Sequence, residues 1–230
     1  MIALLYDIHG NLPALDAVLA DARDRGARRF VLGGDYVLFG AWPRETLARL
    51  RELPDAAWVR GNVDRWTAGL DEARDDAELR GPVDFARAAL GEQLADWLGS
   101  LPESAPVDAR TRAWHASPLS DMRSFLPEPA DDEAELLEGV SEARVVFGHT
   151  HLQFRRTSEV NGIELINPGS VGMPLDGDHR AAYGLVDPDG AIELRRVAYD
   201  HAAAAAAVRE ADRGQEWSAR IAGRLERAAA

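Results

Sequence analysis

Carboxylate, imidazole and amide side chains recur in short loops of this chain, each loop directly after a run of apolar residues. The first such loop holds Asp7 and His9, which follow the apolar residues 2–6. A carboxylate and an imidazole two residues apart can both turn toward one divalent metal ion, because both are common metal ligands. Taken alone, the pair would equally fit a capping aspartate beside a hydrogen-bonded loop histidine.

The pattern returns after four later apolar runs, where the side chains are Asp35, Asn62, His115, and His149 with His151. Four of the six histidines of the chain lie at these positions, an unusual concentration for random placement. Seven such groups are too many for one tetrahedral ion, and they fit two ions that share a bridging carboxylate. The ligand types suit manganese, iron, zinc or nickel.

The apolar runs are interpreted as strands, and the first two lack the alternation of a half-exposed strand, which indicates burial on both faces. The strands are expected over residues 2–6, 30–32, 56–59, 111–114 and 144–147. Asn11 is a candidate N-cap for a helix with Pro13 in its first turn. Open α/β sheets bind ligands at the carboxyl ends of their strands, so these loops should meet at one edge.

The chain is expected to form a single domain over residues 1–230 with two helical additions. Residues 66–106 have a helical and acidic pattern, which predicts an insertion beside the sheet. Strands are expected again over 163–166, 182–186 and 191–197. The tail, about residues 200–230, should be helical, and its stripe of Trp217, Ile221 and Leu225 fits either docking onto the protein or a dimer contact.

Composition excludes several classes of protein. The net charge of −13 should repel long nucleic acid. All 26 basic residues are arginine, which rules out lysine-dependent phosphate loops and Schiff bases, and the absence of cysteine rules out disulfides and thiolate chemistry. No apolar run is long enough to span a bilayer, so a cytoplasmic location is expected, whereas the oligomeric state is unknown.

The order of these motifs resembles the signature of the calcineurin-like metallophosphoesterase superfamily, which reads Asp-x-His, Gly-Asp, Gly-Asn, His and Gly-His-x-His. The match spans roughly residues 1–175, and Gly-His-Thr-His at residues 148–151 is its most specific part. The insertion, the segment Asn-Pro-Gly-Ser at residues 167–170 and the chain length resemble the small bacterial and archaeal phosphodiesterase branch. The resemblance implies a four-layer α-β-β-α sandwich with a dinuclear site at one edge.

The resemblance also implies a ligand set and a reaction. One ion would be held by Asp7, His9, Asp35 and His151, and the other by Asp35, Asn62, His115 and His149, with Asp35 bridging. Manganese is the first expectation for both ions. A hydroxide bridging two such ions would attack a small phosphate ester, more readily a diester than a monoester. Asp35, Asn62, His149 and Asp64 are the expected catalytic residues.

The chain departs from the family pattern at two places. Val63 stands where larger members carry a histidine that protonates the leaving group, so esters with good leaving groups should be favoured. Asp64, next to it, fits either an orienting role toward Asn62 or His115 or an ordinary helix cap. Leu175 stands where an arginine is expected in relatives, and Arg180 is the candidate to replace it, although a surface position suits it better.

Three alternatives to a diesterase are carried forward. The same site could act on phosphomonoesters. The fold could also serve as a non-catalytic protein-binding scaffold, as in the retromer subunit that resembles these enzymes, although such relatives lose ligand histidines that this chain retains. A single-metal hydrolase built on Gly-His-Thr-His alone would leave the Asp35 and Asn62 loops idle.

Overall fold

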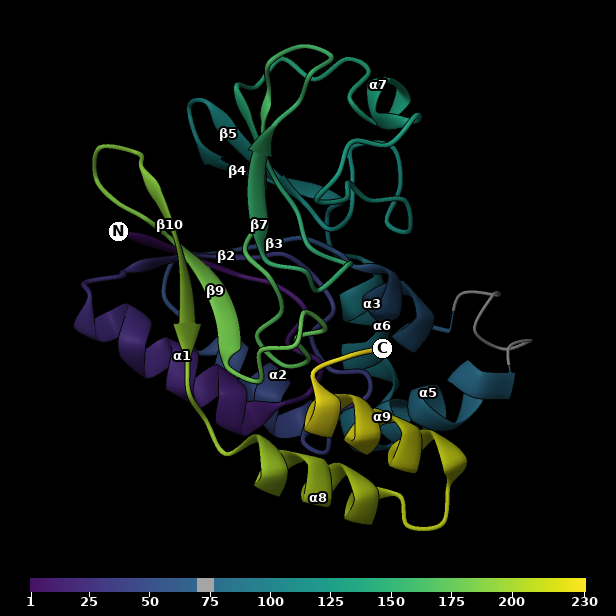
Figure 1. The fold of residues 1–230 in the computed structure, drawn as a ribbon. Coiled ribbons are helices and arrows are strands. Elements are labelled where there is room, and N and C mark those ends of the chain that lie inside the picture. Colours follow the sequence, from purple (N-terminus) through teal and green to yellow (C-terminus); the bar gives the residue numbers. More distant parts are fainter. Residues whose placement is uncertain (70–76) are drawn as a thin grey trace.

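Two five-stranded sheets pack face to face in the computed structural model, which describes residues 1–69 and 77–230 (Figure 1). The first sheet has the strand order β10 (Ile192–Val197), β9 (Ala181–Val186), β1 (Ile2–Leu5), β2 (Arg29–Leu32) and β3 (Ala56–Trp58). The second has the order β4 (Ser104–Asp108), β5 (Thr111–Trp114), β6 (Arg144–Val146), β8 (Glu164–Asn167) and β7 (Phe154–Thr157). A mixed α/β architecture is thereby confirmed.

Each sheet has a parallel centre, and this brings the functional loops together. Strands β1, β2 and β3 run parallel, as do β5, β6 and β8. In β1 and β2, every residue after the first is buried. Their apolar runs therefore lack alternation, as expected for parallel strands covered on both faces. The two sheets meet in an apolar layer that includes Leu4, Val31 and Val146. The Tyr6 hydroxyl crosses this layer and donates to the Val146 carbonyl oxygen at 3.2 Å.

Helices cover the outer face of the first sheet. These are α1 (Leu12–Asp24), α2 (Pro43–Arg51) and α5 (Ala77–Leu90), which share one apolar cluster with that sheet. Helix α1 begins as predicted, with the Asn11 side chain accepting from the Ala14 amide at 3.3 Å. Four further helices follow β3 or the last strand: α3 (Asn62–Thr67), α6 (Glu92–Gly99), and the hairpin of α8 (His201–Ala211) with α9 (Glu216–Arg227).

The outer face of the second sheet carries a thinner layer. Its only regular element in the described ranges is α7 (Glu133–Leu136), a helix of 4 residues, and loops supply the rest. Phe125 and Leu136 pack there against Phe147 and Leu165. Two sheets between two covering layers make the predicted four-layer α-β-β-α sandwich, with one layer reduced mostly to loops (Figure 1).

Several boundaries differ from the sequence expectation. The last helix of the predicted insertion ends at Gly99, and strand β4 already begins at Ser104, so the helical prediction to residue 106 ran too far. Residues 70–76 of that insertion lie outside the described residues. Strand β7 was not anticipated, because Phe154–Thr157 carries two arginines and no apolar run.

The C-terminal tail docks onto its own chain. Trp217, Ile221 and Leu225 of α9 are buried in a cluster with Met173 and Val208, which accounts for the apolar stripe without a second copy. None of the helices within residues 1–69 and 77–230 is long and apolar enough to cross a membrane.

Candidate metal centre

The structure brings all seven candidate ligands together at the edge where the parallel strands end. Asp7 and His9 follow β1, Asp35 follows β2, and Asn62 opens α3 directly after β3. His115 follows β5, and the pair His149 and His151 follows β6. Apart from His149, which is partly exposed, the seven residues are buried. Two sheets therefore contribute to one site, as the spacing of the motifs predicts.

The backbone at five of the seven candidate ligands has an unfavourable left-handed conformation. Eight non-glycine residues in the described ranges have a positive φ, and five of them belong to this set, namely Asp7, His9, Asp35, His149 and His151. A left-handed φ costs about 1–2 kcal/mol for a residue with a Cβ. Such strain concentrated on five polar side chains indicates selection for their position rather than for stability.

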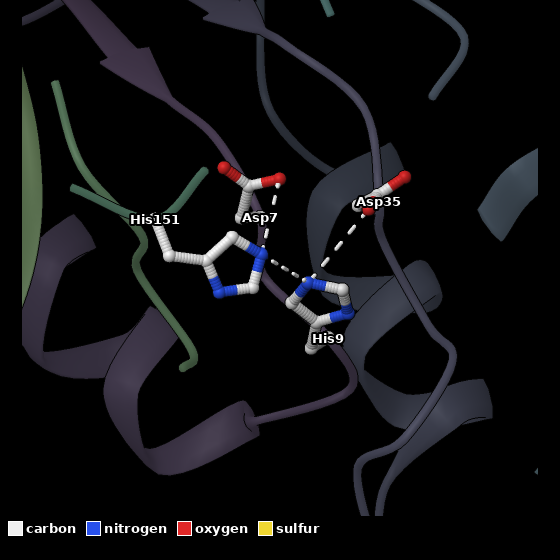
Figure 2. A group of neighbouring side chains, drawn as sticks. All are labelled: Asp7, His9, Asp35 and His151. Atoms are coloured by element: carbon white, nitrogen blue, oxygen red, sulfur yellow. Dashed lines mark hydrogen bonds and ion pairs between the residues drawn. The ribbon is translucent and has the colours of Figure 1, made fainter. Parts of the chain in front are cut away.

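Asp7, His9, Asp35 and His151 form a compact group whose ligand atoms all lie within 4.8 Å of one another (Figure 2). His9 Nε2 is 3.8 Å from Asp35 Oδ2, and His151 Nε2 is 3.7 Å from Asp7 Oδ1. These separations are too long for hydrogen bonds. They leave space between nitrogen and oxygen atoms that a divalent cation fits.

The tautomers of His9 and His151 follow from their backbone contacts. His9 Nδ1 lies 3.1 Å from the Leu38 carbonyl oxygen, and His151 Nδ1 lies 2.6 Å from the Met173 carbonyl oxygen. A carbonyl oxygen only accepts, so each Nδ1 carries the proton. Each Nε2 then presents a lone pair, and the two Nε2 atoms are 3.1 Å apart (Figure 2). Two lone pairs this close repel each other unless a cation between or beside them binds both nitrogen atoms.

Asp7 adds an unsatisfied acceptor to the same place. Its Oδ2 accepts from the His149 amide at 3.0 Å, whereas its Oδ1 is buried and has no hydrogen-bond partner among the described residues. A buried carboxylate oxygen without a partner is costly unless a metal ion or a proton satisfies it. The donor set therefore fits a divalent cation.

A second group adjoins the first through Asp35. His115 Nδ1 donates to the Gly33 carbonyl oxygen at 2.8 Å, so its Nε2 lone pair faces Asn62 Oδ1 at 2.9 Å and Asp35 Oδ1 at 3.4 Å. His149 Nδ1 lies 3.0 Å from the same Asn62 oxygen. One Asp35 oxygen thus faces His115 and the other faces His9, which places this carboxylate between the two groups.

Burial sets the protonation of the site in the absence of a cation. Desolvation lowers the pKa of His115 and of His149 to about 4 and that of His151 to about 3, and it holds the pKa of His9 well below its usual value. All four imidazoles are neutral at pH 7, the form that binds metals. Burial raises the pKa of Asp35 to about 8, and a bound cation would act in the opposite direction.

Asp64 holds the loops of the site through backbone amides. Its Oδ2 accepts from the amides of Gly61 and Asp35, each at 2.8 Å, and its Oδ1 accepts from the Tyr36 amide at 3.1 Å. This is a helix cap at the start of α3 that also ties down the Asp35 loop. Within the described residues, the side chains of Asn62 and His115 have no hydrogen bond to Asp64.

Three residues outside the motifs are placed away from the cluster. Arg180 is exposed and pairs with Asp178 at 2.7 Å, so it does not take the place of a phosphate-binding arginine. His179 and His201 stack on each other at the surface with ring centroids 4.2 Å apart. These outcomes agree with the surface interpretation of Arg180.

Several supporting residues escaped the sequence analysis. The Met173 carbonyl oxygen fixes His151, and the Asn167 side chain donates to the Gly148 carbonyl oxygen at 3.2 Å and to Thr150 Oγ1 at 2.9 Å. Phe39 packs on the His9 ring with centroids 5.6 Å apart. The segment 167–170 was noted only as a resemblance, and no sequence signal identifies a backbone carbonyl as a partner.

Comparisons with known proteins agree with this architecture. A sequence profile of the calcineurin-like phosphoesterase superfamily domain matches residues 1–191. The uncharacterized protein MJ0912 of Methanocaldococcus jannaschii is 33% identical over 221 residues, which cover 87% of this chain and 88% of that protein.

Two further relatives carry descriptions of activity. Phosphodiesterase YfcE of Escherichia coli is 31% identical over 193 residues, covering 82% of this chain and 89% of YfcE. The crystal structure of a metallophosphoesterase from Sphaerobacter thermophilus matches with a TM-score of 0.81 and 30% identity, covering 99% of this chain and 98% of that one.

Proposed function

Because the chain belongs to the calcineurin-like phosphoesterase superfamily, and is therefore a hydrolase acting on ester bonds, we propose that it is a metal-dependent phosphodiesterase with a dinuclear centre. The observation that carries the proposal is the position of Asp35, whose two oxygens face two different groups of nitrogen and oxygen donors. A carboxylate shared in this way is the usual bridge of a two-metal site.

The proposed ligand sets follow the two groups. Asp7, His9, Asp35 and His151 would hold one ion, and Asp35, Asn62, His115 and His149 the other. Manganese is proposed first, with iron, nickel and zinc as the other candidates, since all accept mixed nitrogen and oxygen ligands. When bound, the two ions would supply an activated water at neutral pH and neutralise the oxygens of the phosphoryl group.

The chain's own residues prepare the site for such ions and for an anionic substrate. Backbone carbonyl oxygens fix His9, His115 and His151 with their Nε2 lone pairs free, so no proton has to leave these rings on metal binding. Asp64 fixes the Asp35 loop through two backbone amides. The bound cations would leave the pocket positive within a protein of net charge −13, which favours a phosphate ester.

Leaving groups of low pKa are proposed as the better substrates. Val63 follows Asn62 and lines the same cavity as His149, so the side chain at this position cannot donate a proton to a departing alkoxide. The proposed preference for small phosphodiesters over monoesters is supported by the 31% identity to a phosphodiesterase.

The test compares a chromogenic diester, bis(p-nitrophenyl) phosphate, with its monoester, p-nitrophenyl phosphate. Chelator-stripped protein should be inactive, and Mn²⁺ should restore cleavage of the diester above that of the monoester. His149→Ala should stay inactive with Mn²⁺, and His201→Ala, which changes a surface histidine, should match the unaltered protein. Metal-restored activity on the monoester alone would make the protein a phosphomonoesterase. No turnover with Mn²⁺, Fe²⁺, Ni²⁺ or Zn²⁺ would contradict the enzyme and favour a protein-binding scaffold.

A further inference from the structure

A cavity of about 300 Å³ opens onto the candidate metal centre, and the C-terminal helix supplies part of its wall. Five of the candidate ligands line the cavity, namely His9, Asp35, Asn62, His149 and His151. Arg220, Ile221 and Arg224 of α9 line it as well. Helix α9 lies beyond residue 191, where the family profile ends, so this part of the wall is not described by the family pattern.

The position of α9 relative to the centre is fixed by specific contacts. The Gly177 amide donates to the Ala228 carbonyl oxygen at 2.9 Å, and His179 Nε2 donates to the Glu226 carbonyl oxygen at 2.9 Å. These bonds join the end of α9 to the loop whose Met173 carbonyl oxygen holds His151. The buried stripe of α9 packs against Met173 too, so the helix is anchored on two sides.

Among the arginines of α9 that line the cavity, Arg224 is the one without an ion pair to a described residue. Arg220 forms an ion pair with Glu78, and Arg209 pairs with Glu226 at 2.7 Å. Arg224 is half-buried, and no residue in the described ranges makes a hydrogen bond or ion pair with its guanidinium. The chain has 39 acidic residues for 26 arginines, so acidic partners are plentiful. A partly buried guanidinium without an anionic partner is costly unless an anion from outside the protein binds to it.

The electrostatics of the site agree with a cation at this place. Burial, then the charge of Arg220, lowers the pKa of Arg224 from its ordinary value; the charge of Glu78 opposes this, and that of Arg227 adds to the lowering. The positive charge of Arg224 in turn contributes to the lowering of the pKa of His151, after burial and two neighbouring histidines. The guanidinium is therefore close enough to the centre to act on what binds there.

We propose that Arg224 of α9 binds the phosphate group of the substrate in the cavity that it shares with the candidate metal ligands. The inference rests on the proposed function, since it names a residue that holds the ester at the same site. A guanidinium offers two parallel N–H donors to two phosphate oxygens, which gives orientation as well as attraction. Of the two α9 arginines in the cavity wall, Arg220 is engaged with Glu78, which leaves Arg224 to make this contact.

The test measures the binding of inorganic phosphate to manganese-loaded protein by titration calorimetry, with metal content determined on the same samples. Arg224→Ala should weaken phosphate binding about 10- to 100-fold, the usual effect of losing a hydrogen-bonded charge. Arg224→Lys keeps the charge without the paired donors and should fall between. The matched control is Arg227→Ala, which removes the same charge from an exposed position of the same helix outside the cavity and should bind phosphate normally.

The steady-state kinetics on bis(p-nitrophenyl) phosphate should show the same order, with a raised KM for Arg224→Ala and an unchanged metal content. Phosphate binding by Arg224→Ala within twofold of the unaltered protein would overturn the proposal. So would an equal loss in Arg227→Ala, or a loss of metal in Arg224→Ala. If the unaltered protein cleaves no diester, the proposed function fails, whereas the phosphate titration still decides the role of Arg224.

Discussion

The Nε2 atoms of His9 and His151 lie 3.1 Å apart, and neither can donate a hydrogen bond to the other. Each ring carries its one proton on Nδ1 and donates it to a backbone carbonyl oxygen, that of Leu38 for His9 and that of Met173 for His151. Burial keeps the pKa of both rings far below neutrality, so a second proton does not relieve the contact. The contact between the two lone pairs is repulsive without a cation. It becomes favourable with one, because both nitrogen atoms can then coordinate the same metal ion.

Replacing His151 should therefore cost one metal ion. Under the proposed dinuclear centre we expect the unaltered protein to bind two ions per chain and His151→Ala to retain at most one, because the second group of donors does not include this ring. Metal content after dialysis, measured by plasma mass spectrometry, checks this. His201→Ala is the control and should retain both ions. Two ions per chain in His151→Ala would contradict the assignment.

Asp35 should behave differently from the histidines, because its carboxylate adjoins both groups. Asp35→Asn keeps the oxygen that accepts from the Val63 amide at 3.1 Å and removes the negative charge. We expect loss of both ions and of turnover, with metal-free protein at least as stable as before. The reason is that burial raises the pKa of Asp35 to about 8, so the metal-free folded state must hold a proton there that the neutral Asn does not require. A lower melting temperature of the metal-free variant would refute the stability part.

The strand-end positions were predictable because buried parallel strands are short apolar runs and the polar residue after each run stands out. Asp7, Asp35 and His115 could thus be placed at one edge from the chain alone. The order of the strands within each sheet could not be predicted. Strand β9, for example, is the antiparallel neighbour of β1, although more than 170 residues of sequence separate them. That pairing depends on which apolar faces complement each other, and no local pattern encodes it.

The supporting contacts were also beyond the sequence. Arg224 lies in a helix whose apolar stripe predicts docking, but the spacing cannot say which partner the helix docks on. Strand β7 contains two arginines that form ion pairs with acids of other elements, Arg155 with Glu164 and Arg156 with Glu133. Its sequence therefore lacks the apolar run by which the other strands are recognised. Backbone carbonyl oxygens such as that of Met173 exist at every residue, so their use in orienting His151 has no signature.

Asp64→Asn tests whether this carboxylate does more than cap a helix. The amide keeps one acceptor oxygen in place of two, so at least one of three buried backbone amides loses its partner. We expect the free energy of unfolding to fall by about 1–3 kcal/mol. We also expect kcat to fall while two ions remain bound, because the Asp35 loop is no longer fixed. Reduced stability with unchanged kcat would assign Asp64 to capping alone.

Tyr36→Phe addresses the neighbouring loop without touching a candidate ligand. The Tyr36 hydroxyl lies 2.6 Å from the Val59 carbonyl oxygen and 2.8 Å from that of Leu32, and it accepts from the Gly34 amide at 3.2 Å. The ring is fully buried, so water cannot replace the lost oxygen. We expect a loss of about 1–3 kcal/mol in the free energy of unfolding, measured with urea, and normal metal content. A loss below about 0.5 kcal/mol would show that the loop rearranges to satisfy these groups.

The stability of metal-free protein should decrease as the pH rises from 6.5 to 8. Burial raises the pKa of Asp35 from 3.8 to about 8, so within this range the folded state retains a proton that the unfolded chain has released. Each such carboxyl reduces the free energy of unfolding by about 1.4 kcal/mol per pH unit, and its effect levels off above pH 8. The four buried histidines are neutral in the folded state throughout, whereas the unfolded rings release their protons near pH 6.5. They therefore oppose the decrease between pH 6.5 and about 7.2, and the decrease is clearest from pH 7.2 to 8.

Saturating Mn²⁺ should abolish this decrease, because a cation favours the ionised carboxylate and its binding then strengthens with pH. Urea unfolding at pH 6.5, 7.2 and 8, with and without Mn²⁺, measures both slopes. Asp35→Asn provides the matched control, since it removes one titrating carboxyl and should flatten the metal-free slope while leaving Asp7 and Asp64 in place. A metal-free protein that becomes more stable toward pH 8 would mean that Asp35 is already ionised at neutrality, and that the site tolerates its charge without a cation.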